Sequence, residues 1–355
     1  MNAVPVALTQ PALPPGVRRR FALVHAVRQA LGARWLRSTR ATIEAELLAL
    51  NAATPDAVAT PCDEIDAADC APERFWSTWG AAHRPVVVRG FARHWPAVQE
   101  WTPAWLRDRY GDETIPVRLD GTSTYDYGYT RKPLRDLVDS MLSGGTLAAT
   151  GIEDIVHAHD ELGAMLRIDE VNRLVAPKGK RGAGGQLIPG VFTTELFLAN
   201  QRSRTSLHCA FGNNLFVMIE GRKRWTQIDP RWTALLGPRV QSSSHFMATD
   251  VDYNAPPAEQ VDAGYPLFRY APRTEAWLEP GDAIFSPQWW WHAVENDGPT
   301  IGLACRVLTD LFHGQPTMSL LALCSRAGLR MFIEARRDGH TSDRKVLAAA
   351  ESWED

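Results

Sequence analysis

The sequence has little of several features that would place a protein in a specialised class. Its longest apolar windows, such as Pro85–Phe91, are far shorter than the roughly 20 residues that a membrane-spanning helix needs. Arg18, Arg19 and Arg20 precede an apolar stretch, but this stretch breaks at Arg28 and no small-residue cleavage site follows. We therefore expect no signal peptide, no membrane partner and a cytoplasmic location.

Cysteine is scarce, and neither sign of charge dominates. The five cysteines are an odd number without a CxxC pair, so the sequence supports neither a disulfide framework nor a zinc ribbon. The net charge of −3 comes from 38 basic and 41 acidic residues, and the basic residues are scattered. A nucleic-acid partner is therefore not expected.

What is present is a chain of 355 residues, 45% hydrophobic, which is long enough for a large core. Apolar residues at helical spacing between Val17 and Leu50 predict one or two helices, and a Pro-, Ala- and Asp-rich linker follows to about residue 71. We expect an N-terminal helical segment and linker at 1–71, a catalytic domain at 72–312, and a C-terminal helical segment at 313–355.

Strand and helix signals alternate in the first half of the predicted catalytic domain. The stretch 84–90 reads as a buried strand, and Trp101–Asp112 as a helix with a Thr N-cap followed by Pro. IPVRL starts another strand, and Leu134–Leu142 reads as a helix. The Gly- and Lys-rich residues 175–188 predict a mobile flap.

Short strands with Gly and Pro turns dominate from Val191 to Thr309. They are FTTELFLAN, RTSLHCAF, NLFVMIEG, KRWTQID, EPGDAIFSP and TIGLACRVL. This pattern predicts an antiparallel barrel or jelly roll. The apolar tail Met318–Arg337 predicts a helix that packs on a partner surface.

Two histidines in the strand region have the spacing of metal ligands. Residues two apart on a strand face the same way, so His208 and position 210 share a face while Cys209 points away. His292 follows the EPGD turn and the strand AIFSP. Two histidines with one carboxylate form the facial triad of non-haem Fe(II) oxygenases. Here, however, position 210 is alanine.

A lysine lies between the two histidines in the sequence, after a predicted turn at Gly221–Arg222. If Lys223 points into the barrel, its ammonium can bind the distal carboxylate of 2-oxoglutarate, a contact of about 1.5–3 kcal/mol. Thr205 and Asn214, on neighbouring strands, can add hydrogen bonds to this cosubstrate.

The ordered motifs resemble one family. Residues 84–110, TSLH, NLFVMIEGRKRW and LEPGDAIFSPQWWWHAVEN are similar to the JmjC-type cupin oxygenases, whose cupin-like group includes an asparaginyl hydroxylase. The resemblance covers about 72–310 and implies an α+β, mostly β fold: a double-stranded β-helix with an N-terminal α/β elaboration and C-terminal helices. It also implies iron ligands at His208, at position 210 and at His292, a 2-oxoglutarate lysine at Lys223, and a homodimer through the C-terminal helices.

Ala210 departs from this family, which has Asp or Glu there. Fe(II) with two neutral imidazoles and chelating 2-oxoglutarate carries about one net positive charge, and buried net charge is unfavourable unless it is paired. Chloride at the open position restores neutrality, as in the iron/2-oxoglutarate halogenases with His-x-Ala or His-x-Gly. We therefore expect Fe(II)-, O2- and 2-oxoglutarate-dependent halogenation of a small molecule or a peptide or protein. The alternatives are a two-histidine hydroxylase and a non-catalytic binding protein that has lost iron.

Several other side chains are weaker candidates. Glu195 offers a distal carboxylate from a neighbouring strand, and Arg306 offers a partner for a carboxylate or anion. Cys209 is favoured as a packing residue. The aromatic and histidine clusters allow packing, pocket-lining or solvated roles; they are Trp289, Trp290 and Trp291, Tyr125, Tyr127 and Tyr129, and His157 and His159.

Overall fold

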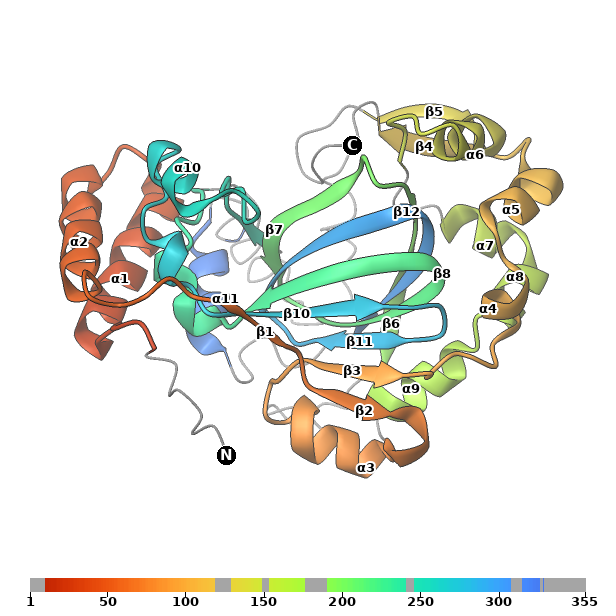
Figure 1. The fold of residues 1–355 in the computed structure, drawn as a ribbon, viewed down its shortest axis with the longest axis horizontal. Helices are drawn as coiled ribbons and strands as arrows, with labels where there is room; N and C mark the ends of the chain where they lie inside the picture. The colour runs from red at the N-terminus through yellow and green to blue at the C-terminus, as the bar shows by residue number, and fades with distance from the viewer. Residues whose placement is uncertain are drawn as a thin grey trace, which may run out of the picture. The chain divides into compact units, whose positions relative to one another are not determined.

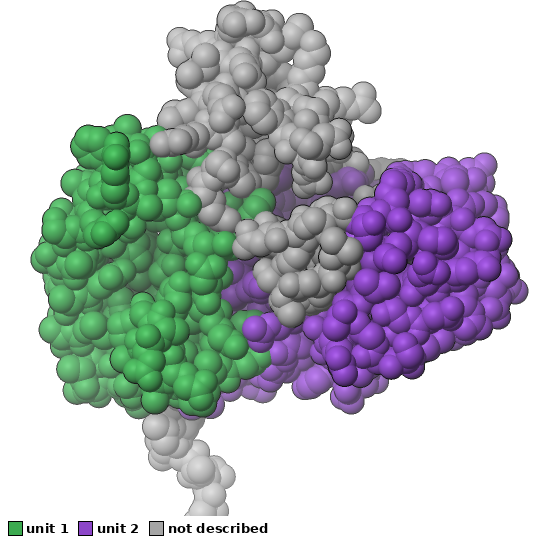
Figure 2. Space-filling model, turned by 90° about the horizontal axis from the view of Figure 1, so that it is seen from above, with its two compact units in different colours: residues 1–57, 230–272, 315–355 green, residues 58–229, 273–314 purple. Residues whose placement is uncertain are grey.

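The computed structural model describes residues 10–118, 129–148, 153–175, 190–240, 246–307, 315–325 and 328. The chain divides into two compact units, which Figure 2 colours green and purple. Unit 1 consists of residues 1–57, 230–272 and 315–355, and unit 2 of residues 58–229 and 273–314. None of the described helices is long and apolar enough to cross a membrane.

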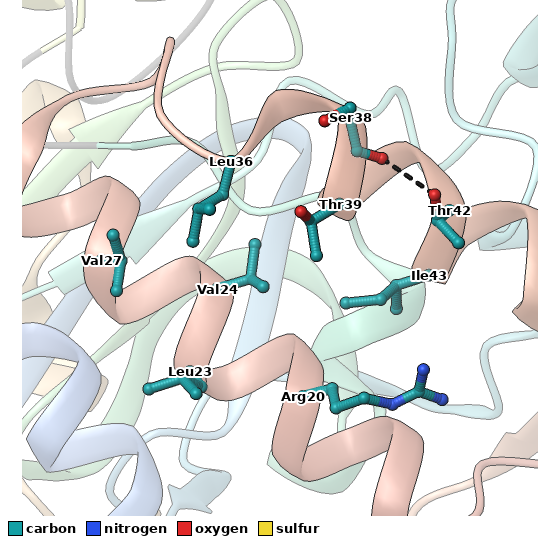
Figure 3. A pocket seen from close by; sticks show the side chains of 9 residues that line it. All are labelled: Arg20, Leu23, Val24, Val27, Leu36, Ser38, Thr39, Thr42 and Ile43. Carbon is teal, nitrogen blue, oxygen red and sulfur yellow. Dashed lines mark hydrogen bonds between the residues drawn. The ribbon is translucent and has the colours of Figure 1, made fainter.

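Unit 1 contains the two predicted N-terminal helices, α1 (Pro15–Leu31) and α2 (Arg37–Leu50). Residues three or four apart on each helix are buried, including Phe21 and Val24 on α1 and Ile43 and Leu47 on α2. A pocket of about 500 Å³ lies against these helices, and its wall is largely apolar (Figure 3). The rest of the unit comprises the short elements β9 (Phe246–Ala248), α10 (Pro257–Asp262) and α11 (Pro316–Leu323), with 3-10 turns at Pro230–Leu235 and Phe268–Tyr270.

The helices of unit 2 lie between its strands along the chain (Figure 1). They are α3 (Pro72–Phe75), α4 (Pro96–Glu100), α5 (Pro103–Tyr110), α6 (Leu134–Leu142), α7 (Glu153–Ala158), α8 (Asp160–Met165) and α9 (Ile168–Val175). The predicted N-cap of α5 is confirmed, because the Thr102 hydroxyl accepts from the Trp105 amide at 3.1 Å.

A mixed sheet forms most of unit 2. Its strands are β1 (Ala59–Pro61), β2 (Glu64–Asp66), β3 (Val86–Arg89), β6 (Val191–Ala199), β7 (Arg204–Ala210), β8 (Asn213–Ile228), β10 (Arg273–Leu278), β11 (Ala283–Ser286) and β12 (Trp291–Val307). Their order is β2-β3-β11-β8-β12-β7, while β10 joins β8 to β1 and β6 pairs with β12. A separate hairpin pairs β4 (Thr114–Arg118) with β5 (Tyr129–Pro133).

Alternate residues of these strands enter two different cores. Leu215, Val217 and Ile219 of β8 pack into a large cluster with residues of the unit 2 helices, such as Leu106 and Leu137. The residues between them join a second cluster that is lined by strands: Phe216, Met218, Ile284, Val294 and Ala304. This alternation produces the predicted double-stranded β-helix, with helices on its outer face and a barrel interior lined by the second cluster.

The predicted turn at Gly221–Arg222 is wrong, because β8 continues through it as one strand. Gly221 adopts φ +77°, and a Cβ there would lie 2.3 Å from the Pro299 carbonyl oxygen. The inward residues of β8 are even-numbered before this point, as in Phe216, and odd-numbered after it, as in Trp225. The irregularity at Gly221 therefore turns Lys223 toward the barrel interior, as a β-bulge does.

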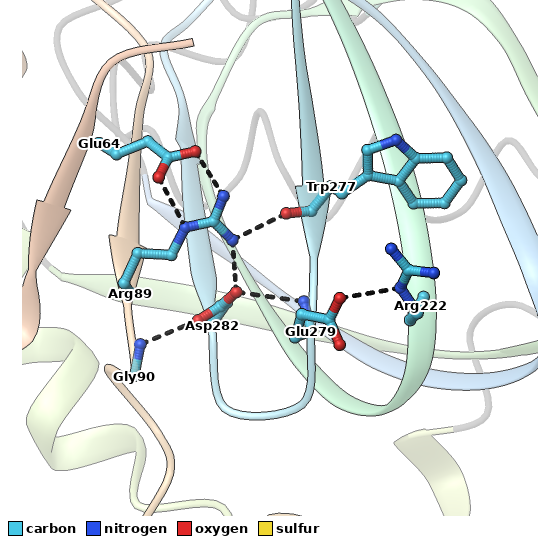
Figure 4. Close-up of polar contacts among 7 residues, drawn as sticks. All are labelled: Glu64, Arg89, Gly90, Arg222, Trp277, Glu279 and Asp282. Carbon is cyan, nitrogen blue, oxygen red and sulfur yellow. Dashed lines mark hydrogen bonds and ion pairs between the residues drawn. The ribbon is translucent and has the colours of Figure 1, made fainter. Parts of the chain in front are cut away.

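The EPGD turn is held by a buried carboxylate (Figure 4). Asp282, 4% exposed, accepts hydrogen bonds from Arg89 at 2.6 Å, from the Gly90 amide at 2.9 Å and from the Glu279 amide at 3.1 Å. Arg89 also binds Glu64 and the carbonyl of Trp277. These bonds fix the β10–β11 turn against β3.

Other expectations differ from the structure. The predicted linker contains β1 and β2, which are too short to show alternation. Both β8 and β12 are long strands rather than short ones, and β10 was not among the predicted strands. The predicted flap at 175–188 lies, apart from residue 175, outside the described residues, as do Tyr125, Tyr127, the Tyr129 side chain and the tail beyond residue 328.

Candidate active site

The two candidate ligand histidines face each other across neighbouring strands. His208 on β7 and His292 on β12 are paired in register, and their ring centroids are 4.2 Å apart. Each Nδ1 lies 2.9 Å from a backbone carbonyl, that of Ser206 for His208 and that of Trp290 for His292. A bond of this kind holds the proton on Nδ1 and fixes the ring, which is how metal-binding histidines are oriented.

Both imidazoles favour the neutral form that binds metals. Burial lowers the pKa of His292 to about 4, and the charge of Arg306 acts in the same direction. Burial, followed by repulsion from His292, holds the pKa of His208 well below its ordinary value, although hydrogen bonds to the backbone of Ser206 and His292 oppose this. Neither ring therefore needs to lose a proton near neutral pH before it binds a metal.

The third position of a facial triad has no donor. Ala210 is the last residue of β7, and its methyl group lies on the His208 side of the strand. Within the described ranges, no group of three or more His, Cys, Asp or Glu side chains is arranged to hold a metal. The residues present therefore fit a metal through two imidazoles and leave the carboxylate position to another ligand.

The backbone at Ala210 is held by the segment that precedes β12, the strand of His292. The Trp289 amide donates to the Ala210 carbonyl at 2.7 Å, and Trp289 adopts φ +64°, an uncommon conformation for a bulky residue. Trp289, Trp290 and Trp291 are all buried, and the Trp290 indole donates to the His83 carbonyl at 2.8 Å. This segment anchors the start of β12.

The side chain of Lys223 lies in the barrel interior and is only 4% exposed. Its ammonium donates to Asn296 Oδ1 and lies 5.8 Å from the Phe216 ring centroid. Asn296 is oriented by its own Nδ2, which donates to the Ser203 carbonyl at 2.6 Å. A buried ammonium in this interior can bind the carboxylate of a ligand through a charge-assisted hydrogen bond.

The remaining predicted residues also belong to inward-facing positions. Thr205 pairs with Val294, and Asn214 pairs with both Ser286 and Arg306. Arg306 donates to Glu195 at 2.6 Å, so the two weaker candidates form an ion pair with each other. The structure therefore brings Thr205, His208, Asn214, Lys223, His292 and Arg306 to one interior, although their roles stay predictions.

The other candidates lie elsewhere or face away. Cys209 is fully buried, and its side chain points to the face of β7 opposite to that of His208 and Ala210. His159 Nε2 lies 2.9 Å from a carboxylate oxygen of Glu113, and its ring centroid lies 4.6 Å from that of Tyr110 with the rings tilted by 55°, so it belongs to a separate polar cluster next to α5. His157 is exposed on α7.

Sequence reasoning missed three residues of this interior. The Trp225 ring stacks on His292, with centroids 5.4 Å apart and 20° between planes. Gln227 pairs in register with His292, and Asn296 pairs with Lys223. The available signal was that Trp225 and Gln227 follow Lys223 at a spacing of two, as inward residues of one strand do.

Comparison with known proteins agrees with this geometry. Residues 72–306 match the family described as the cupin-like domain. The chain belongs to this family. The cupin-like match includes the strands of unit 2 that carry both histidines and Lys223, and it confirms the fold class that the sequence predicted.

Several curated proteins are similar to this cupin-like chain. It is 24% identical over 252 residues to Jumonji C domain-containing protein 5 of Drosophila melanogaster, covering 70% of this chain and 60% of that protein. It is 24% identical over 229 residues to lysine-specific demethylase 8 of Xenopus tropicalis, covering 62% and 47%. It is 26% identical over 235 residues to tRNA wybutosine-synthesizing protein 5 of Gallus gallus, covering 63% and 70%. The chain thus spans less than two thirds of the first two relatives.

Proposed function

We propose that this chain is a 2-oxoglutarate-dependent oxygenase that oxidises a C–H bond at an iron held by His208 and His292. The observation that carries the proposal is the paired, neutral histidines in the same barrel interior as the buried Lys223. Membership of the cupin-like family and relatives named for a Jumonji C domain and a lysine demethylase support it. We propose a protein, peptide or small-molecule substrate.

Each residue has a separate task in this proposal. His208 and His292 hold the metal through the ring nitrogens opposite their carbonyl-bonded Nδ1 atoms. Lys223 exchanges its bond with Asn296 for the distal carboxylate of 2-oxoglutarate, and Thr205 and Asn214 add hydrogen bonds. When bound, iron supplies the O2 chemistry that splits 2-oxoglutarate into succinate and CO2 and leaves one oxygen atom for the substrate.

We further propose that chloride takes the position beside Ala210. Without a carboxylate, two neutral imidazoles leave the metal with net positive charge, and a small anion lowers this charge in a buried site. The reaction is then R–H, Cl⁻, H⁺, 2-oxoglutarate and O2 to R–Cl, succinate, CO2 and water. A hydroxylase uses no chloride and gives R–OH, succinate and CO2.

The first experiment measures succinate from 2-oxoglutarate with Fe(II) and O2, with and without chloride. We expect succinate that requires both histidines. No succinate and no metal binding after anaerobic loading would instead favour a non-catalytic binding protein. The mass of the oxidised product then separates the two enzymes, because one gains an oxygen atom and the other exchanges hydrogen for chlorine.

Two substitutions sharpen this test. Lys223→Ala should weaken 2-oxoglutarate binding on the order of 10–100-fold, since a contact of about 1.5–3 kcal/mol is lost; an unchanged affinity contradicts the assignment of Lys223. Ala210→Asp should supply the missing carboxylate, abolish chlorination and strengthen metal binding. Chlorination that survives this change refutes the chloride position.

A further inference from the structure

A buried amide lies beside the histidine pair and has no hydrogen-bond partner among the described residues. Gln227 is 1% exposed, and in the described part of the chain neither its Oε1 nor its Nε2 is hydrogen-bonded. It lies in a row of four side chains on adjacent strands, because His208 pairs with His292, His292 with Gln227, and Gln227 with Thr274. Members of such a row point to the same side of a sheet. The amide therefore faces the interior that contains both histidines.

Two neighbours of Gln227 share this feature. Trp225 Nε1 and Thr274 Oγ1 are also buried and have no hydrogen-bond partner in the described ranges. Burying such groups unpaired costs stability, and several of them together on one wall indicate a ligand that would pair with them. The Gln227 amide, the Trp225 indole and the Thr274 hydroxyl each offer a donor, and none of the three side chains is acidic. This donor set suits a carboxylate.

The position of Gln227 relative to Lys223 gives the orientation of that ligand. Lys223, Trp225 and Gln227 are successive inward residues of β8, so the Cα atoms of Lys223 and Gln227 are about 13 Å apart. The Trp225 side chain lies between them, and all three point into the barrel interior. A short dicarboxylate bound along this row would have one end at Lys223 and the other toward Gln227, next to His292.

We propose that Gln227 is a cosubstrate-binding residue whose amide, together with Trp225 Nε1 and Thr274 Oγ1, hydrogen-bonds the carboxylate at the 2-oxo acid end of 2-oxoglutarate. This inference rests on the proposed function and adds to it the three residues that orient the 2-oxo acid end of the cosubstrate. Lys223 binds the distal end only.

The test compares two 2-oxo acids. 2-Oxoglutarate and 2-oxobutyrate share the 2-oxo acid end, but only the former has a distal carboxylate. Their affinities are measured by calorimetry, with competition for the weaker acid, in the absence of O2 and with Mn(II) in place of iron. Gln227→Leu should weaken both acids by the same factor, about 10-fold. Lys223→Ala, the matched control, should weaken 2-oxoglutarate alone. Mn(II) affinity without an oxo acid should be unchanged in Gln227→Leu.

Stability separates a binding role from a structural one. Gln227→Leu replaces an unpaired amide with an apolar group, so the midpoint of unfolding without ligands should stay the same or rise. Thr274→Val removes only a hydroxyl and should weaken both acids several-fold with the same midpoint. If Gln227→Leu lowers the midpoint of unfolding, the affinities of Thr274→Val for the two acids replace those of Gln227→Leu as the test of the proposal.

Three results overturn the proposal. The first is unchanged affinity for both acids in Gln227→Leu, or in Thr274→Val when that variant decides. The second is a loss confined to 2-oxoglutarate, which places Gln227 at the distal end. The third is a wild-type protein that binds neither Mn(II) nor either acid, which removes the proposed function and this inference with it, whereas the first two leave the proposed function standing.

Discussion

Gly221 is the residue whose replacement tests most directly how the fold delivers Lys223 to the barrel interior. In Gly221→Ala the new Cβ meets the Pro299 carbonyl oxygen at 2.3 Å and Thr300 Cγ2 at 3.0 Å, and the residue must also hold φ +77°. A left-handed backbone costs a non-glycine residue about 1–3 kcal/mol. The enforced shift of β12 adds about 1–3 kcal/mol, as overpacking does. We expect a total loss of about 2–6 kcal/mol in the free energy of unfolding.

The chain offers a matched control on β12. Gly298 has φ +88°, but a Cβ there meets none of the described residues within 4 Å, so Gly298→Ala should carry the backbone cost alone. Urea unfolding followed by tryptophan fluorescence measures both variants, and Gly221→Ala should lose about 1–3 kcal/mol more than Gly298→Ala. Its affinity for 2-oxoglutarate should also fall, because the bulge sets the direction of Lys223. Equal losses in the two variants would refute the close approach of β8 and β12 at this point.

Two further predictions concern stability. Asp282→Ala removes one acceptor of Arg89, which keeps Glu64 and the Trp277 carbonyl, and leaves the Gly90 and Glu279 amides without this acceptor. At about 1–3 kcal/mol for each unsatisfied amide, the free energy of unfolding in urea titrations should fall by about 2–6 kcal/mol. The loss should be smaller in Asp282→Asn, and a loss below about 1 kcal/mol in Asp282→Ala contradicts the role of this turn. Burial lowers the pKa of His25 to about 3, so the unfolded chain binds this proton first and stability falls as the pH drops below about 6.5. His25→Phe should remove about 3 kcal/mol of this loss at pH 4.5. The free energy of unfolding is measured against pH for the wild type and the variant, and an equal loss in acid for both would show that His25 is not the group responsible.

The parts of the site that the sequence predicts are those with a spacing signature. His208 and Ala210 share a face because strand residues alternate, and the EPGD turn marks the approach to His292. Glycine and proline punctuation likewise predicts most strands of the barrel. Helical periodicity predicts α1, α2 and α6 with bounds close to those observed.

The parts that the sequence does not predict depend on register between distant strands. The face of Lys223 is set by the irregularity at Gly221, which looks like an ordinary turn in the sequence. The role proposed for Gln227 rests on its pairing with His292, 65 residues later, and on the absence of hydrogen-bond partners for its amide among the residues that the structure describes. A glutamine in a strand has no such meaning by itself. Likewise, Trp225, rather than an aromatic residue adjacent to His292, provides the ring that stacks on it.

The bond from the Trp289 amide to the Ala210 carbonyl has a consequence for how this site can change. Both partners are backbone groups, so the path of the chain at position 210 does not depend on which side chain is present there. A carboxylate can therefore be gained or lost at this position without refolding its surroundings. The scaffold and the ligand set are separable here, which makes position 210 a place where a single substitution can redirect chemistry while the rest of the barrel is unchanged.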